Sequence, residues 1–159
     1  MIETCGVYMI TMGIRVAPGA VTFAVYDSDN DEIVNLDAIL IPVAFDTPDA
    51  LKYVRSNLLD VLREYGVHRA GIRTTEPSAQ RKNIDRIEME GVIQESFASS
   101  DLDSYYIGHV SSIMSRLGLP RTDFKPLVDG DQDPNIDNWG AMSKEEREAV
   151  LCAKGAVNA

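Results

Sequence analysis

The chain has 159 residues, of which 45% are hydrophobic and 25% are charged, and its formal net charge is −10 at pH 7. This is the composition of a globular protein long enough for one core, so we expect a single domain over residues 1–159. The negative charge argues against non-specific attachment to DNA or to an anionic membrane. The sequence has no apolar run of spanning length and no signal-peptide pattern at its start, which predicts a cytoplasmic protein.

Runs rich in β-branched residues with short connections occupy the first quarter of the chain. They are residues 10–16, 19–26 and 33–41. A Pro-Gly turn at Pro18 separates the first two, and a polar turn over 27–32 separates the second from the third. This spacing predicts an antiparallel meander. Large and small side chains alternate along the second run, which indicates helices on both faces of the sheet.

A helix is predicted next, with Thr47 as N-cap, Pro48 in the first turn and Gly66 as the stop. Residues 67–73 form a short strand after it, which the crossover rule places parallel to a central strand. A helix over 84–97, a strand over 104–107 and a helix over 110–117 follow. We expect a long loop over 119–142, after which a capping box of Ser143 and Glu146 starts the last helix.

Three segments carry a resemblance to a known fold. They are residues 13–27, residues 70–94 and residues 145–153. The strand, Pro-Gly turn and strand over 13–27 resemble the opening of the RNase H-like nucleases, among them the RuvC-type Holliday junction resolvases. Ile72-Arg73 and the run Met89-Glu90-Gly91-Val92-Ile93-Gln94 are similar to a small bacterial family of RNase H-like proteins with no established activity. The resemblance implies an α/β fold: a mixed five-stranded sheet, with the meander joined to parallel strands and helices on both faces.

In the active relatives, carboxylates hold two divalent ions about 3.5–4 Å apart, and the ions cleave phosphodiesters. The resemblance places Arg15 and Arg73 where those relatives have an aspartate and a glutamate. It places Glu145 and Glu148 near the paired aspartates of the last helix. A guanidinium stays protonated and offers only donors, so it repels Mg²⁺ and cannot ligate it. We therefore expect a degenerate metal site at these four positions, with no catalytic residue and no bound metal.

The two arginines should converge at the former metal position. Three interpretations are open: an internal salt bridge to Glu145 or Glu148, a site for phosphate or another anion, or side chains that simply point into solvent. A second basic group consists of Arg69, Arg81, Lys82 and Arg86. It could contact an anion or nucleic acid, or merely be a solvated helix entrance, and no interleaved aromatic residues support base stacking.

Other candidate motifs give weaker indications of function. The aspartate-rich run from Asp129 suggests a calcium loop, but its sixth position is Pro134 and its twelfth is Gly140, which excludes the usual ligand pattern. Trp139 is interpreted as packing its loop onto the body, with an exposed partner anchor as the alternative. His68 and His109 receive no catalytic role. Cys5 and Cys152 are expected to be free thiols, because no CxxC pair or nearby histidine indicates zinc or a disulfide framework.

Together these patterns predict a non-catalytic binding or assembly module, a pseudonuclease that acts with a protein partner and needs no cofactor. Two alternatives stay open. The first is a divergent metal-dependent nuclease, using Mg²⁺, in which side chains such as Asp27, Glu76, Glu88 or Glu90 replace the missing ligands. The second is a nucleic-acid-binding pseudonuclease that uses Arg15 and Arg73 on phosphate. No contact with membrane is expected.

Overall fold

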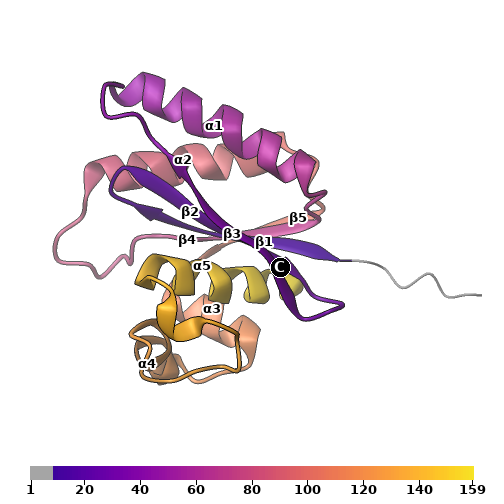
Figure 1. The fold of residues 1–159 in the computed structure, drawn as a ribbon. Helices are drawn as coiled ribbons and strands as arrows, with labels where there is room; N and C mark the ends of the chain where they lie inside the picture. Colours follow the sequence, from indigo (N-terminus) through magenta and orange to yellow (C-terminus); the bar gives the residue numbers. More distant parts are fainter. Residues whose placement is uncertain (1–8) are drawn as a thin grey trace, which may run out of the picture.

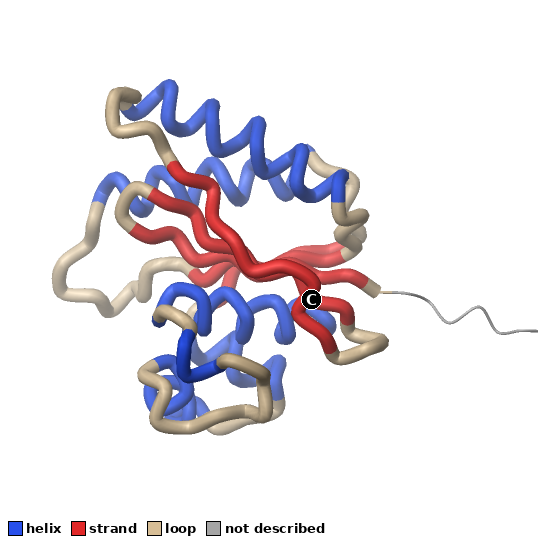
Figure 2. Tube along the Cα trace, in the orientation of Figure 1, coloured by secondary structure: helices blue, strands red, loops and turns tan. Residues whose placement is uncertain are grey.

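A sheet of five strands forms the centre of the computed structural model, which describes residues 9–159 (Figure 2). The strands are β1 (Ile10–Ala17), β2 (Ala20–Asp27), β3 (Glu32–Leu40), β4 (Arg69–Arg73) and β5 (Ser104–Gly108). Their order across the sheet is β3-β2-β1-β4-β5. Cys5, one of the two predicted free thiols, lies outside the described residues.

The strand pairing follows the predicted connections. β1 pairs antiparallel with β2, and β2 pairs antiparallel with β3, so the three-stranded meander is confirmed. β4 pairs parallel with β1 on its other side, and β5 pairs parallel with β4. A helix precedes each of these two strands and returns the chain to the same end of the sheet, as parallel pairing requires. The mixed α/β sheet predicted from the sequence is therefore present.

Helices cover both faces of the sheet (Figure 1). α1 (Thr47–Glu64) and α2 (Ile84–Ser99) lie on one face, while α3 (Val110–Leu117), α4 (Phe124–Val128) and α5 (Lys144–Gly155) lie on the other. The N-cap of α1 is Asp46 instead of the predicted Thr47, because the Asp46 carboxylate accepts the Asp49 N–H. The capping box of Ser143 and Glu146 at the start of α5 is confirmed. None of the helices in residues 9–159 has the length and apolar character needed to cross a membrane.

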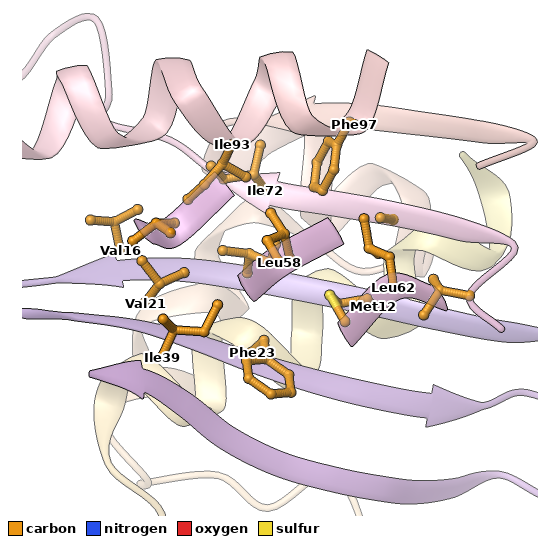
Figure 3. Packing of buried hydrophobic residues seen from close by; sticks show 14 of the residues in the cluster. Met12, Val16, Val21, Phe23, Ile39, Leu58, Leu62, Ile72, Ile93 and Phe97 are labelled. Atoms are coloured by element: carbon orange, nitrogen blue, oxygen red, sulfur yellow. The ribbon is translucent and has the colours of Figure 1, made fainter. Parts of the chain in front are cut away.

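Successive side chains of β1 point to opposite faces of the sheet and so face two different cores. Met12, Ile14 and Val16 join the apolar cluster beneath α1 and α2, where Leu58, Ile93 and Phe97 pack against them (Figure 3). The side chains between them, including that of Arg15, face α5. Successive residues of a strand point to opposite faces, so this polar position follows from the period of the strand. The candidate site therefore lies on the α5 side of the sheet.

The segment over 119–142 differs from the predicted loop. It contains α4, and short 3₁₀ turns at Arg121–Asp123 and Trp139–Ala141. Trp139 is 1% exposed, and its indole N–H donates to the Leu127 carbonyl at 3.0 Å. Arg147 of α5 is also buried and donates to the carbonyls of Trp139 and Val128. Trp139 thus packs the segment onto α5, as the first interpretation held, and the partner-anchor alternative is wrong.

Candidate functional site

Arg15 and Arg73 meet at the carboxyl ends of neighbouring strands. They are register partners in the parallel pairing of β1 and β4. The Arg15 Nη1 donates to the main-chain carbonyl of Arg73 at 3.3 Å. Both residues are largely buried, with 9% and 6% of their surfaces exposed. The structure thus brings together the two arginines that the sequence placed at one position, and neither extends freely into solvent.

Gly13 allows α5 to lie directly on β1. A β-carbon at Gly13 would stand 2.0 Å from the Ala149 carbonyl oxygen and 2.2 Å from the Ala153 nitrogen. No side chain fits there, so the helix backbone touches the strand backbone. Glycine inside a strand often marks such a close approach. This contact holds the first half of α5 over the carboxyl end of β1, where Arg15 lies.

Glu148 of α5 closes the arginine cluster. Its carboxylate lies 2.6 Å from Arg15 Nε and 3.9 Å from Arg73 Nε. The side chains of Arg15 and Glu148 are each 11% exposed, so solvent screens this pair weakly. Glu145 is half-buried one turn earlier, and no ion pair joins it to either arginine in the described residues. Of the three interpretations, the geometry favours the internal salt bridge, with Glu148 as the carboxylate.

The guanidinium of Arg73 contacts a more varied set of groups than that of Arg15. Its Nη1 lies 3.5 Å from Glu76 and donates to the Thr74 carbonyl, and the guanidinium stands 5.6 Å from the centre of the Phe124 ring. Its Nε has no hydrogen-bond partner among the described residues. Burial, and next the charge of Arg15, lower the pKa of Arg73, while Glu148 and Glu76 oppose that change. The guanidinium remains protonated at neutral pH.

Two further carboxylates fasten the loop that follows β4. Glu76 accepts the Val110 N–H at the start of α3 at 2.7 Å, where the helix dipole favours negative charge. Glu90 of α2 is 3% exposed and accepts both the N–H and the hydroxyl of Thr75 at 3.0 Å. Sequence reasoning missed this role of Glu90. A signal was present, because Glu90 lies on the same helix face as the buried Ile93 and Phe97.

Among the described residues, Glu76 is the one proposed substitute metal ligand that contacts an arginine, and its carboxylate lies 3.5 Å from Arg73 Nη1. Asp27 pairs with Ile10, at the far end of β1 from Arg15, and its carboxylate accepts N–H groups of the adjacent turn. Glu88 is exposed on α2. Glu76 and Glu90 hold the loop as described. Across residues 9–159, no three His, Cys, Asp or Glu side chains come together as a metal site would require.

The donor set at the cluster therefore does not fit the divalent ions that this fold family implies. Two of the four positions carry guanidinium groups, which only donate hydrogen bonds and repel cations. The Glu148 carboxylate at a third position is engaged by Arg15 at 2.6 Å. A pair of Mg²⁺ ions needs several carboxylate oxygens directed at one point. The residues at this position therefore do not suit a reaction that depends on a pair of metal ions.

The basic group predicted from the sequence is dispersed. Arg69 lies at the opposite end of β4 from Arg73 and donates to the Val157 carbonyl at 2.5 Å. Arg81 and Lys82 are exposed on the loop before α2, and Arg86 is half-buried in the first turn of α2. No hydrogen bond or ion pair connects these four residues with Arg15 or Arg73 in the described part of the chain. They do not form one patch with the buried cluster.

The remaining candidates have structural partners. His68 Nδ1 accepts the Ile10 N–H at 3.0 Å, and His109 Nδ1 lies 3.3 Å from the Thr74 hydroxyl. Asp129, the start of the aspartate-rich run, pairs with Lys144 at 3.1 Å. Cys152 is a buried free thiol, and burial raises its pKa to about 11. Each of these groups is accounted for by packing or pairing within the fold.

Comparison with solved structures shows which known folds this chain resembles. Thermus thermophilus RuvC superposes with a TM-score of 0.64 at 10% identity, covering 92% of each chain. T. thermophilus RuvC in complex with a Holliday junction substrate gives a TM-score of 0.65 at 11% identity, over 93% of this chain and 92% of that one. The yeast mitochondrial Holliday junction resolvase Ydc2 gives 0.59 at 14% identity, over 93% of this chain and 77% of that one.

The chain has the RuvC fold. At these identities the likeness shows the RNase H-like fold alone. No protein-family model and no curated protein matches the sequence, so the finer resemblance to a small bacterial family stays a prediction. The RuvC fold does account for the convergence of Arg15, Arg73 and Glu148, because it brings the ends of β1 and β4 under the last helix.

Proposed function

We propose that this protein is a pseudonuclease, an RNase H-like module that binds or assembles with a protein partner and does not cleave nucleic acid. The observation that carries the proposal is the contact of 2.6 Å between Arg15 and Glu148. It fills the former metal position with an internal ion pair, in which the cation is part of the chain. A partly buried pair of this kind is costly to separate.

The surrounding residues support the same conclusion. The loop after β4 is fastened across the cluster by Glu76 and Glu90, which contact α3 and Thr75. Arg15 and Arg73 are both under 10% exposed, so a phosphodiester would have to displace Glu148 to reach them. The net charge of −10 opposes the approach of nucleic acid and suits a partner with a basic surface.

A cleavage assay tests the proposal. The protein is incubated with a four-way DNA junction, linear DNA and RNA in the presence of Mg²⁺ or Mn²⁺, beside the Glu148→Ala variant. We expect no product above background from either protein. Metal-dependent turnover by the wild type that Glu148→Ala abolishes would contradict the proposal and support a divergent nuclease.

Nucleic-acid binding without cleavage is a second candidate function. The RuvC neighbour in complex with a Holliday junction gives it a structural precedent, and Arg81 and Lys82 are exposed on the loop before α2. If it holds, junction binding should weaken steeply with salt, and Arg81→Ala with Lys82→Ala should weaken it further. Binding that is undetectable at low salt excludes this candidate and leaves the protein-binding module.

A further inference from the structure

β3 is an edge of the sheet whose outer side no other described strand pairs. The Ile41 N–H donates to the Gly19 carbonyl at 2.9 Å, and Leu40 is the register partner of Ala20. In an antiparallel ladder such pairs alternate, so Leu36, Ala38 and Leu40 direct their main-chain groups away from β2. The Ala38 N–H is taken by the Asp37 carboxylate at 2.8 Å. Within residues 9–159 no hydrogen bond outside the ladder with β2 engages the outward main-chain groups of Leu36 and Leu40, so another strand can pair with them.

A groove continues from this edge toward α5. It has a volume of about 630 Å³ and lies between the first half of β3 and the segment 135–142. Ile33 and Leu36 on one side and Ile136 and Met142 on the other are half-buried apolar side chains that pack on the α5 core. Val34, also on β3, is 45% exposed. The groove therefore offers apolar contact beside unpaired main-chain groups.

The charge of the groove indicates which kind of ligand it favours. Among the described residues that line it are four carboxylates, those of Asp31, Glu32, Asp137 and Glu146, and one cation, Lys154. Lys154 lies 3.9 Å from Asp31, and Glu146 is engaged in the capping box. The side chains of Glu32 and Asp137 form no hydrogen bond or ion pair within residues 9–159, and both residues are exposed. An excess of uncompensated negative charge favours a cationic ligand over an acidic one or a second copy of this chain.

We propose that the β3 edge and its groove bind an extended segment of a partner protein in which basic and apolar side chains alternate. The segment adds a strand to the sheet along Leu36 to Leu40, a recognised mode of peptide binding. Every second side chain of the added strand points into the groove, because successive side chains of a strand point to opposite faces. This inference rests on the proposed function, and it identifies the class of partner and the surface that receives it.

The test is fluorescence anisotropy with a labelled peptide of about eight residues that alternates valine and lysine, the length of one strand. We expect saturable binding at physiological salt. The charge-reversing pair Glu32→Lys with Asp137→Lys should weaken binding about tenfold, since each reversal replaces an attraction by a repulsion. The matched control, Glu64→Lys with Glu88→Lys, makes the same change of net charge at exposed sites outside the groove and should leave affinity unchanged.

A second peptide, N-methylated at alternate residues on its pairing edge, has the same charge and cannot form the ladder. We expect it to bind far more weakly. The inference is overturned if the wild type shows no saturable binding, if a valine-glutamate peptide binds equally well, if the control pair weakens binding as much as the groove pair, or if N-methylation has no effect. These results leave the cleavage assay unaffected, so the failure of this surface and the failure of the proposed function are distinguishable.

Discussion

At the scale of single residues, the cluster neutralises a buried carboxylate with a cation from the same chain. In a metal-dependent nuclease, cations from solution neutralise buried carboxylates. Here Arg15 neutralises Glu148 at 2.6 Å. The arrangement also needs Glu76, because Glu148 alone cannot balance both Arg15 and Arg73, and Glu76 lies 3.5 Å from Arg73. Four charged groups of two signs thus form one network.

Arg15→Ala should therefore destabilise the fold. Removal of Arg15 takes away the closer cation of the buried Glu148 carboxylate and leaves Arg73 at 3.9 Å, which costs roughly 3–5 kcal/mol of unfolding free energy. Urea unfolding of the wild type and the variant measures this. Arg63→Ala is the matched control, because Arg63 pairs with Asp60 at an exposed site and should change little.

The same urea unfolding experiments, repeated with phosphate in the buffer, distinguish a closed cluster from a site that binds an external anion. In a closed cluster, added phosphate stabilises neither protein beyond its general salt effect. An Arg15→Ala variant as stable as the wild type, together with selective stabilisation of the wild type by phosphate, would show that the arginines face an open anion site.

Cys152 gives the protein a predictable dependence on alkaline pH. Burial raises the pKa of its thiol from an ordinary value of 9.0 to about 11. The unfolded chain loses this proton first, so stability is full below about pH 9 and falls by about 2–3 kcal/mol as pH rises to about 11. Cys152→Ala should show a shallower decline over this range. Equal slopes in the two proteins, measured by urea unfolding from pH 8 to 11, would contradict the raised pKa.

The residue identities at this site could be predicted from the sequence, but their roles only in part. Arg15 and Arg73 lie in two predicted strands that the resemblance places side by side, and the last helix offers two glutamates. The choice of Glu148 over Glu145 depends on how α5 rotates on β1, which is fixed by packing at Gly13 and is not visible in local pattern. The contact between Glu76 and the start of α3 depends on two loops meeting in space.

At the scale of elements, α5 is the part that positions the site. It rests on β1 through Gly13, where a β-carbon would lie 2.0 Å from helix backbone. Strands and long helices could be predicted because their apolar periods are local properties. The helix α4 was missed for the opposite reason: it is short, contains Pro126, and packs Phe124 and Leu127 in the core that Trp139 completes. Tertiary contacts, not local propensity, support it.

Gly13→Ala should displace α5 and destabilise the protein by about 3 kcal/mol or more, because backbone atoms cannot give way as a flexible side chain can. Gly91→Ala is the control: Gly91 lies on α2 with no atom within 4 Å of an added β-carbon. That change should stabilise the helix by about 0.5–1 kcal/mol. If both variants unfold at the same urea concentration as the wild type, the contact between Gly13 and α5 does not constrain the fold as argued above.

At the scale of the whole molecule, the RuvC fold is combined with a buried ion-pair cluster and a strongly negative net charge. The fold brings β1, β4 and α5 together as in a nuclease, while the charge of −10 opposes nucleic acid over most of the surface. The exposed β3 edge and its acidic groove lie away from the arginine cluster, on the other side of β1 in the sheet. We therefore propose that the β3 edge binds a partner, while the arginine cluster stabilises the fold.

The most direct measurement is calorimetric titration of Mn²⁺ into the wild type and into Arg15→Asp with Arg73→Glu, which restores carboxylates beside Glu148. We expect no saturable binding to the wild type and new binding to the double variant, provided circular dichroism shows that the variant folds. The wild-type titration decides the claim even if the variant does not fold. Stoichiometric Mn²⁺ binding by the wild type that Glu148→Ala abolishes would contradict it.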